Sequence, residues 1–513
     1  MWFPLEILHY MYQTSGKWPQ PHRAAEPEFT APISPQALED LYEGCADFES
    51  RRVDFGLKGS VGVYVCWLDG LVSADRVSNE VIRPLTEALR AHGVESEEQC
   101  IARILTGGVY RCAVHRRSSL DDLISDLGHG SCALVFGGSM AALSFELRSD
   151  AGRAVEQPTL EKSLKGAKDS FTEQLRVNTA LIRRRISGPG LKLAESCIGR
   201  RSRTRVALLY MEGLASPEIA AEVARRLDRI DVDALLSMGP LEEALADTPG
   251  SPLPQLLHTE RPDRFAMHLM DGRVGLLVDG LPVGLVVPVN LAEFMKVTGD
   301  SCSHYLVASS LTLLRYGALL LTLLLPGLYV AIAMYHQEMI PTRLLLSVIR
   351  SEQEIPFPSA LEVLGMLGAF GLLQEAGLRL PNPVGDTVSI IGALIVGQAA
   401  VEAKLISPIA IIVVAVAGIA GYALPSQDLS AALRLWRLIL LLGAAWAGLF
   451  GLSLALCLML WRLCGMDSFG LNYSAPLSDG RPWGLWRLLI RMPQLKNKFR
   501  DPALGGSDRR RQP

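Results

Sequence analysis

The spacing of apolar and polar residues divides the chain into two unlike regions. Up to about residue 306, charged and apolar residues are mixed, and short apolar runs alternate with amphipathic stretches. This alternation is typical of an α/β protein. From about 314 to 461 the sequence is mainly apolar, as in helices that cross a membrane. The pattern predicts a soluble α/β N-terminal half followed by an all-α polytopic membrane domain.

One strand-and-helix pattern occurs twice in the first half. The stretch "VYVCWLDGLVSADRVSNEVIRPL" begins at Val63, and "VALLYMEGLASPEIAAEVARRL" begins 143 residues later, at Val206. Each reads as an apolar strand, a turn, a Ser-initiated entry and an amphipathic helix.

A hairpin pattern also recurs, at an offset of 142. It is "GSCALVFGGSMAALSFELR" in the first copy and "GRVGLLVDGLPVGLVVPVN" in the second. Gly137-Gly138 and Asp279-Gly280 are expected to supply the positive φ of the tight turns. Two independent matches favour a pair of related subdomains over chance similarity between apolar strands.

These patterns suggest a division of the chain into six parts. We expect an N-terminal extension (1–52), α/β subdomain 1 (53–155), a linking amphipathic helix (156–200), α/β subdomain 2 (201–306), a transmembrane helical domain (307–464) and a basic tail (465–513).

The linking helix is predicted from "SFTEQLRVNTALIRRRI". Ser170 followed by Glu173 has the spacing of a capping box, which predicts that the helix begins there. Arg183, Arg184 and Arg185 would then end it with charge that suits the helix dipole. We interpret the triplet as a solvated helix end, because no aromatic residues are interleaved to favour nucleic-acid binding.

Segments long enough to span a bilayer occur at four places in the second half. They are 314–335, 385–402, 405–424 and 434–461, the last of which is long enough to need tilt or a protruding end. A weaker segment, 359–378, could instead lie at the interface, re-enter or line a cavity. We favour four membrane spans, although the sequence is also compatible with five or six hydrophobic elements.

Five polar residues in this region are candidates for an ion path. Gln398 and Glu402 lie four residues apart, on one face of a helix. A charge at the bilayer centre costs about 2.5–3.5 kcal/mol, so such residues usually face protein or water. The pair either makes a polar contact between packed helices or lines an aqueous path. Glu362, Glu375 and Glu338 are further candidates, although Glu338 could be a loop acid.

The charge distribution predicts how the chain is oriented in the membrane, and the cysteine content predicts the redox state of its compartment. Residues 481–513 are basic, which places the C-terminus in the cytoplasm by the positive-inside tendency. Because the N-terminal half is expected on the same side, the number of crossings should be even. The net charge of -3 averages over unlike regions. The nine cysteines form no C-x-x-C pair and do not cluster with histidine, so we expect no metal site, no cofactor and a reducing compartment. The N-terminus does not have the pattern of a secretory signal.

Common catalytic motifs are absent from the sequence. It contains no G-x-x-x-x-G-K-[ST], G-x-S-x-G, H-E-x-x-H or helix-opening G-x-G-x-x-G. The stretch "HTERPDRF", residues 258–265, reads as a salt-bridged loop rather than a catalytic site. We therefore expect that the chain is not an enzyme.

Several long stretches, in order from about residue 53 to 478, resemble the A subunit of spore germinant receptors of the GerA family. They include "SFTEQLRVNTALIRRRI", "LPGLYVAIAMYHQEMIPTRLLLSV", "LPNPVGDTVSIIGALIVGQAAVEAKLISP" and "SFGLNYSAPL". The resemblance implies a multi-pass protein of the spore inner membrane whose N-terminal domain and C-terminal tail are cytoplasmic. It also implies a transporter-like B subunit and a lipoprotein C subunit as partners, and a homo-oligomer in the lipid bilayer.

The same resemblance implies nutrient sensing that triggers germination, with the A subunit as an oligomeric ligand-gated cation channel. A ring of Gln398 and Glu402 side chains would suit that role. Two alternatives stay open. The chain could be a non-conducting scaffold subunit, or the A-subunit-like paralogue associated with the spore dipicolinic acid channel.

Overall fold

The structure is a computed structural model of the whole chain. It describes residues 29, 31–55, 61–92, 96–108, 113–138, 140–148, 157–158, 161, 165–353, 355–379, 397–477, 488–493, 498–500, 504, 506, 508 and 510–511. Most of the predicted span 385–402, and nearly all of the extension before residue 31, lie outside these residues.

The first α/β region is a five-stranded antiparallel sheet with helices on both faces. The strands are β1 (Phe48–Phe55), β2 (Val61–Leu68), β3 (Val114–Arg117), β4 (Ser131–Phe136) and β5 (Ala142–Glu146). The helices are α2 (Pro35–Leu41), α3 (Ala74–Arg76), α4 (Arg83–His92), α5 (Glu97–Arg103) and α6 (Leu120–Gly128), with π-helical turns at Val77–Ile82 and Ile104–Gly108. The strand order is β1-β2-β4-β5-β3.

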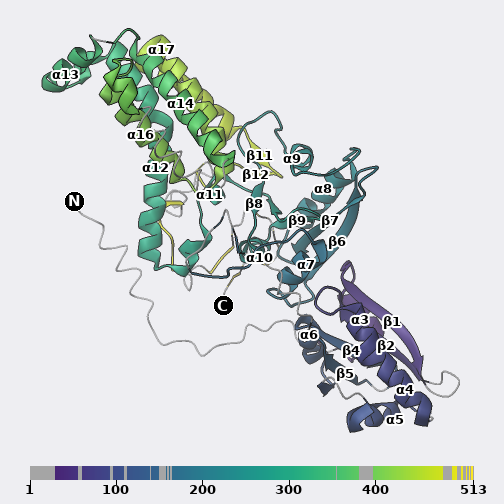
Figure 1. Cartoon of the computed structure of the whole chain (residues 1–513). Helices are drawn as coiled ribbons and strands as arrows, with labels where there is room; N and C mark the ends of the chain where they lie inside the picture. The colour runs from purple at the N-terminus through teal and green to yellow at the C-terminus, as the bar shows by residue number, and fades with distance from the viewer. Residues whose placement is uncertain are drawn as a thin grey trace, which may run out of the picture.

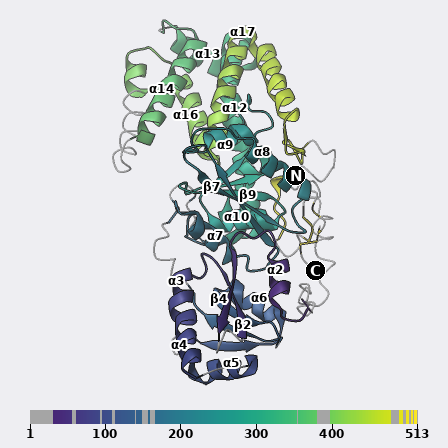
Figure 2. The ribbon, with the colours of Figure 1, turned by 90° about the vertical axis from the view of Figure 1, so that its right-hand side faces the viewer.

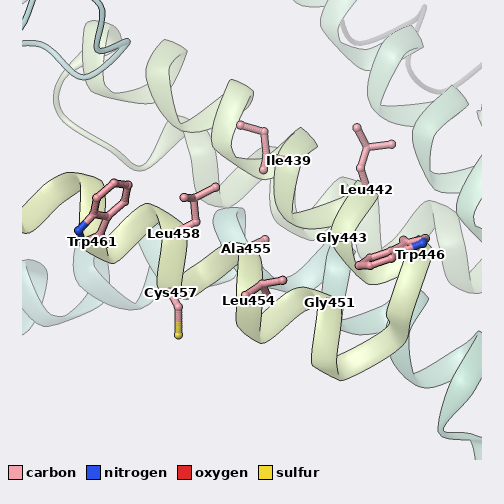
Figure 3. A pocket seen from close by; sticks show the side chains of 10 residues that line it. All are labelled: Ile439, Leu442, Gly443, Trp446, Gly451, Leu454, Ala455, Cys457, Leu458 and Trp461. Atoms are coloured by element: carbon pink, nitrogen blue, oxygen red, sulfur yellow. The ribbon is translucent and has the colours of Figure 1, made fainter.

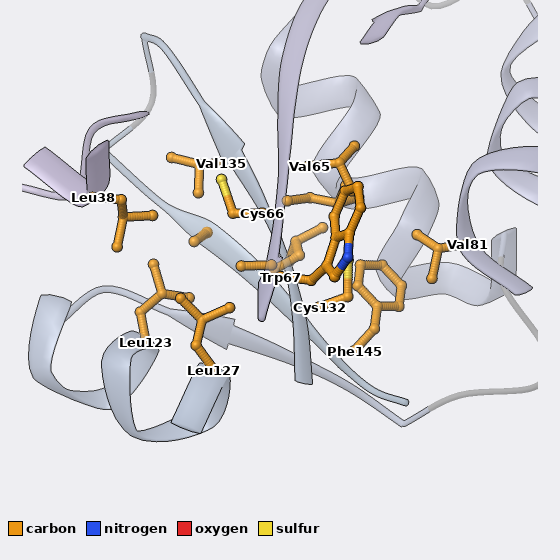
Figure 4. Close-up of a cluster of buried hydrophobic side chains, with 14 of the residues drawn as sticks. Leu38, Val65, Cys66, Trp67, Val81, Leu123, Leu127, Cys132, Val135 and Phe145 are labelled. Atoms are coloured by element: carbon orange, nitrogen blue, oxygen red, sulfur yellow. The ribbon is translucent and has the colours of Figure 1, made fainter. Parts of the chain in front are cut away.

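Alternation along the strands fills a core on each face of this sheet. In β2, Cys66 lies on the face of the sheet that carries Leu123 and Leu127 of α6, whereas Trp67 lies on the opposite face, toward Val81 (Figure 4). Successive side chains of a strand face opposite sides, so a strand covered on both faces is apolar throughout.

The second α/β region repeats this arrangement. Its strands are β6 (Leu191–Ile198), β7 (Thr204–Met211), β8 (Leu257–Thr259), β9 (Val274–Val278) and β10 (Gly284–Val287). Its helices are α7 (Leu175–Arg183), α8 (Pro217–Asp228), α9 (Gly239–Leu245), α10 (Pro262–Met270) and α11 (Leu291–Phe294), followed by a 3-10 turn at Thr298–Cys302.

Both sheets have the same topology. The second has the order β6-β7-β9-β10-β8, which matches the first strand by strand. β1 begins at Phe48 and β6 at Leu191, 143 residues later. β5 begins at Ala142 and β10 at Gly284, 142 residues later. The offset seen in the sequence is thus the offset between equivalent strands.

The two hairpin turns differ from the prediction at one point. Gly280 has φ +84, as the Asp279-Gly280 turn requires. Gly137 and Gly138 do not have a positive φ, and Met140, with φ 47, takes the left-handed conformation instead. The two connections have the same length, but the left-handed residue of the first lies beyond the glycine pair, so the prediction was wrong for the first copy.

The linking helix begins later than predicted, at Leu175 rather than Ser170. The preceding residues are held in an extended path by tertiary contacts. Phe171 is buried in the second core, and its N–H donates to the Glu260 carbonyl at 2.8 Å. These contacts outweigh the local capping signal, which is worth only about 1 kcal/mol.

The interpretation of the arginine triplet as a solvated helix end is wrong for Arg183. Its guanidinium is only 1% exposed and donates to both carboxylate oxygens of Asp47, at 2.7 and 2.9 Å. Asp47 precedes β1, so this buried ion pair joins α7 to the first sheet. Arg185, by contrast, pairs with Asp169 nearer the surface.

The second half of the chain is helical. Its helices are α12 (Tyr305–Tyr335), α13 (Thr342–Glu352), α14 (Ser359–Arg379), α16 (Pro408–Tyr422) and α17 (Gln427–Cys464), with a 3-10 turn at Gln337–Met339. Among the described residues, α12 and α17 are long and apolar enough to cross a membrane. The helices stand at one end of the molecule, the second sheet lies next to them and the first sheet lies farthest away (Figures 1 and 2).

The α17 segment reverses direction, so the expectation of one long span over 434–461 is wrong. Ala447 and Gly448 leave the helical conformation, and Gly448 has φ +61. A Cβ added to Gly451 would lie 2.0 Å from the Gly443 carbonyl oxygen. Eight residues of straight helix span about 12 Å, so this approach requires two arms folded side by side. Figure 3 shows both arms and the turn beyond Trp446.

A short strand pair follows α17 and returns to the second sheet region. β11 (Asp467–Ser468) pairs with β12 (Leu471–Asn472). The Ser468 hydroxyl accepts a hydrogen bond from Val289 N at 3.2 Å, and the Tyr473 carbonyl accepts one from Leu291 N at 2.9 Å. Farther on, Arg511 pairs with Asp271. The tail therefore returns to the α/β half at these places, and Arg491 N donates to the Ser309 hydroxyl near the start of α12.

Candidate functional site

A buried carboxylate lies where three helices meet, at the end of the bundle away from the sheets. Glu362 is in the first turn of α14 and is 3% exposed. Its Oε2 accepts a hydrogen bond from Ser407 N at 2.7 Å. Ser407 is the N-cap of α16, and its hydroxyl accepts from Ala410 N at 3.2 Å. The carboxylate thus lies at a helix N-terminus, where the helix dipole favours negative charge.

Other oxygen atoms surround this carboxylate. Tyr329 of α12 packs in the same apolar cluster as Val363 and Ala410, near Ser407 and Glu362. Ser359, the first residue of α14, donates to Glu352 Oε1 at 2.7 Å. The site therefore combines two carboxylates with hydroxyl groups from three elements.

Two of these oxygens have no hydrogen-bond partner among the described residues. They are Oε1 of Glu362 and the hydroxyl oxygen of Tyr329, and both atoms are buried. A buried polar atom without a partner costs roughly 1–3 kcal/mol, and more when it is charged. Such atoms indicate a bound group or a functional constraint.

The other predicted ion-path residues are exposed. Gln398 and Glu402 lie on a helical stretch at 397–402, and both side chains are exposed on the single chain. Glu338 is exposed in the 3-10 turn after α12, and Glu375 is exposed on α14. Only Glu362 of the five is buried, so the chain alone does not bring the five together.

A second site joins the sheets to the helices, and the sequence patterns did not predict it. The imidazole of His258 in β8 contacts Asp428 Oδ2 through Nδ1 and Glu242 Oε1 through Nε2, each at 2.9 Å. Asp428 opens α17 and Glu242 belongs to α9. Burial lowers the pKa of His258, but its hydrogen bonds to the two carboxylates outweigh this and raise the pKa to about 9. His258 is therefore cationic at neutral pH.

One arginine also anchors this junction, and two more form ion pairs within the α/β half. Arg315 of α12 donates to both oxygens of Asp300, at 2.6 and 2.9 Å. In "HTERPDRF", Arg261 pairs with Asp263 at 2.6 Å and Arg264 pairs with Glu161. The interpretation of this stretch as salt-bridged is confirmed, although α10 begins within it, at Pro262.

Both sites are built from charged and polar side chains that act through electrostatic interactions. Among the described residues, no group of three or more His, Cys, Asp or Glu side chains is placed to hold a metal ion. The junction couples the position of α17 to the α/β half through charge. The Glu362 site presents carboxylate and hydroxyl oxygens, which are the ligands of hard cations.

The fold and these sites define a protein whose duplicated α/β half is fixed to a bundle of apolar helices. Residues 36–503 match the family model described as Bacillus/Clostridium GerA spore germination protein. The chain therefore belongs to the GerA family of spore germination proteins.

Individual relatives match over nearly the whole chain. Spore germination protein KA of Bacillus subtilis (strain 168) is 33% identical over 94% of this chain and 89% of its own. The uncharacterized membrane protein YfkQ of the same organism is 34% identical over 90% of each chain. A crystal structure of the N-terminal domain of the A subunit of the Bacillus megaterium spore germinant receptor GerK3 matches 49% of this chain and 92% of that one, with 27% identity and a TM-score of 0.39.

Proposed function

We propose that this chain is the A-type membrane subunit of a nutrient-sensing germinant receptor and acts as an oligomeric ligand-gated cation channel. In this proposal its partners are the B and C subunits, and it spans the spore inner membrane several times. The six-part division of the chain, with α/β half and tail in the cytoplasm, belongs to the same proposal. The family, the apolar helices and the return of the tail to the α/β half support it.

The exposure of Gln398 and Glu402 is the observation that carries the channel role. Both lie one turn apart on the same exposed face, within an apolar region. Facing lipid, an ionised Glu402 would cost about 2.5–3.5 kcal/mol. Facing a water-filled path between subunits, it would remain hydrated and attract cations. Oligomers that put this face toward such a path are favoured over ones that leave it in lipid.

Coupling to a ligand-binding partner would pass through the junction. His258, Asp428 and the Arg315–Asp300 pair fix α17 and α12 to the α/β half. A shift of the α/β half is thereby transmitted to two apolar helices by charged contacts. A channel requires two states that such contacts stabilise differently.

Potassium release from spores tests the proposal. Glu402→Gln keeps the size and removes the charge, whereas Glu402→Ala removes both. We expect nutrient-triggered release to slow at least severalfold in both variants, since 1.4 kcal/mol of lost cation stabilisation corresponds to about tenfold. Glu243→Gln, an exposed acid of α9, is the matched control. Normal release in the Glu402→Gln variant, with the receptor at its native level, would favour the non-conducting scaffold.

A further inference from the structure

Within the part of the chain that the structure describes, the buried acid Glu362 forms no ion pair. The backbone N–H of Ser407 donates to Oε2, and Oε1 has no hydrogen-bond partner among the described residues. An ionised carboxylate taken out of water without a partner is strongly destabilised. The site must therefore be completed by a proton or by a bound cation.

A proton alone leaves the hydrogen bonds incomplete. A protonated Oε1 becomes a donor, and it then needs an acceptor. The Tyr329 hydroxyl could serve as donor or acceptor, but it makes no hydrogen bond to Oε1 in the structure. No described acceptor therefore lies within hydrogen-bond distance of Oε1. A cation, in contrast, uses the lone pairs of both oxygens at once.

The composition of the site determines the class of cation. The buried oxygens come from one carboxylate and the hydroxyls of Tyr329 and Ser407. Glu352, nearer the rim, already accepts a hydrogen bond from Ser359. Divalent ions usually take more carboxylates than this, whereas a single negative charge with neutral oxygens suits a monovalent ion.

We propose that Glu362, Tyr329 and Ser407 bind one Na⁺ or K⁺ ion at the junction of α12, α14 and α16. The site is separate from the exposed face of Gln398 and Glu402. It holds three helices together rather than conducting. Because the ion binds the folded bundle and not the unfolded chain, it stabilises the bundle by mass action.

Thermal unfolding of the purified full-length protein in detergent tests this. The midpoint is measured while KCl or NaCl replaces N-methyl-D-glucamine chloride at constant chloride concentration. We expect a saturable rise of the midpoint with K⁺ or Na⁺ in the natural sequence. Glu362→Gln retains an acceptor for Ser407 N and should abolish the rise. Tyr329→Phe should raise the half-saturating concentration, by about five- to tenfold for one lost neutral ligand.

Glu243→Gln removes an exposed carboxylate of α9, in the α/β half, and serves as the control, with the cation effect intact. Equal midpoints of the natural protein in all three salts would overturn the proposal, and this result needs no variant to fold. A cation effect that persists in Glu362→Gln would overturn it as well. Since the readout is stability, the result is independent of whether the chain conducts.

Discussion

The ion pair between Asp47 and Arg183 should be among the most sensitive positions in the α/β half. Both side chains are 1% exposed, and two charge-assisted hydrogen bonds of 2.7 and 2.9 Å join them. In Asp47→Asn the shape is retained, but the guanidinium stays buried without its countercharge. Breaking such a pair by removing one partner costs about 3–5 kcal/mol.

Hydrogen exchange of the full-length protein measures this locally. At about 1.4 kcal/mol per factor of ten, amides of β1 and α7 that exchange through opening of this contact should lose protection by about a hundredfold to a few thousandfold. Asp231→Asn is the matched control, because its pair with Arg200 is exposed at 63% and 69% and is worth at most about 1 kcal/mol. Asp47→Ala combined with Arg183→Met should cost less than Asp47→Ala alone.

A loss of protection below about fivefold in Asp47→Asn would refute this reasoning. It would mean that water or another acceptor replaces the carboxylate around Arg183. A double variant that is less stable than the single one would also refute it, because the penalty would then come from packing rather than from uncompensated charge.

Two further changes test the junction and the α17 turn. Because the pKa of His258 is raised to about 9 from an ordinary 6.5, its stabilisation of the junction is complete below about pH 6.5 and is lost as the pH rises through 9. Between these pH values, hydrogen exchange of β8 and the start of α17, corrected for the intrinsic rate, should rise in the natural protein but not in His258→Gln. An identical rise in both proteins would exclude the mechanism. Gly448→Ala should destabilise the protein by about 1–3 kcal/mol, since its φ is +61 and a Cβ would lie 2.8 Å from that of Tyr335. Gly371→Ala, where a Cβ meets nothing within 4 Å, is the comparison, and equal unfolding midpoints would contradict the prediction.

The local pattern of apolar residues was sufficient to predict helices and strands whose sequence signal lies within the element itself. The apolar run 314–335 lies within α12, and the weaker segment 359–378 coincides with α14. Strand patterns repeated at a constant offset correspond to strands at equivalent places in two sheets. These features depend on periodicity and length, which one sequence contains.

Features that depend on distant partners could not be predicted in this way. Arg183 resembles a solvated helix end until Asp47, 136 residues away, is placed beside it. Whether Glu362 or Glu402 is buried depends on how each helix is rotated against its neighbours. The reversal at Ala447–Gly448 has no proline or polar residue to mark it, and its cause is the close approach of Gly443 and Gly451. Each of these features depends on a contact between two residues or helices, which the sequence of one of them does not contain.

The docking of β11 and β12 on the second sheet region has a consequence for biosynthesis. One apolar cluster contains Phe171 and Phe265 of the α/β half together with Leu463 and Tyr473 from the end of the bundle. Ser468 contacts Val289, 179 residues earlier in the chain. At about 5–20 residues per second, a ribosome needs roughly 10–40 s to make that interval. The second α/β unit therefore completes its folding only after the last helix has been synthesised, whereas the first can form its own core much sooner.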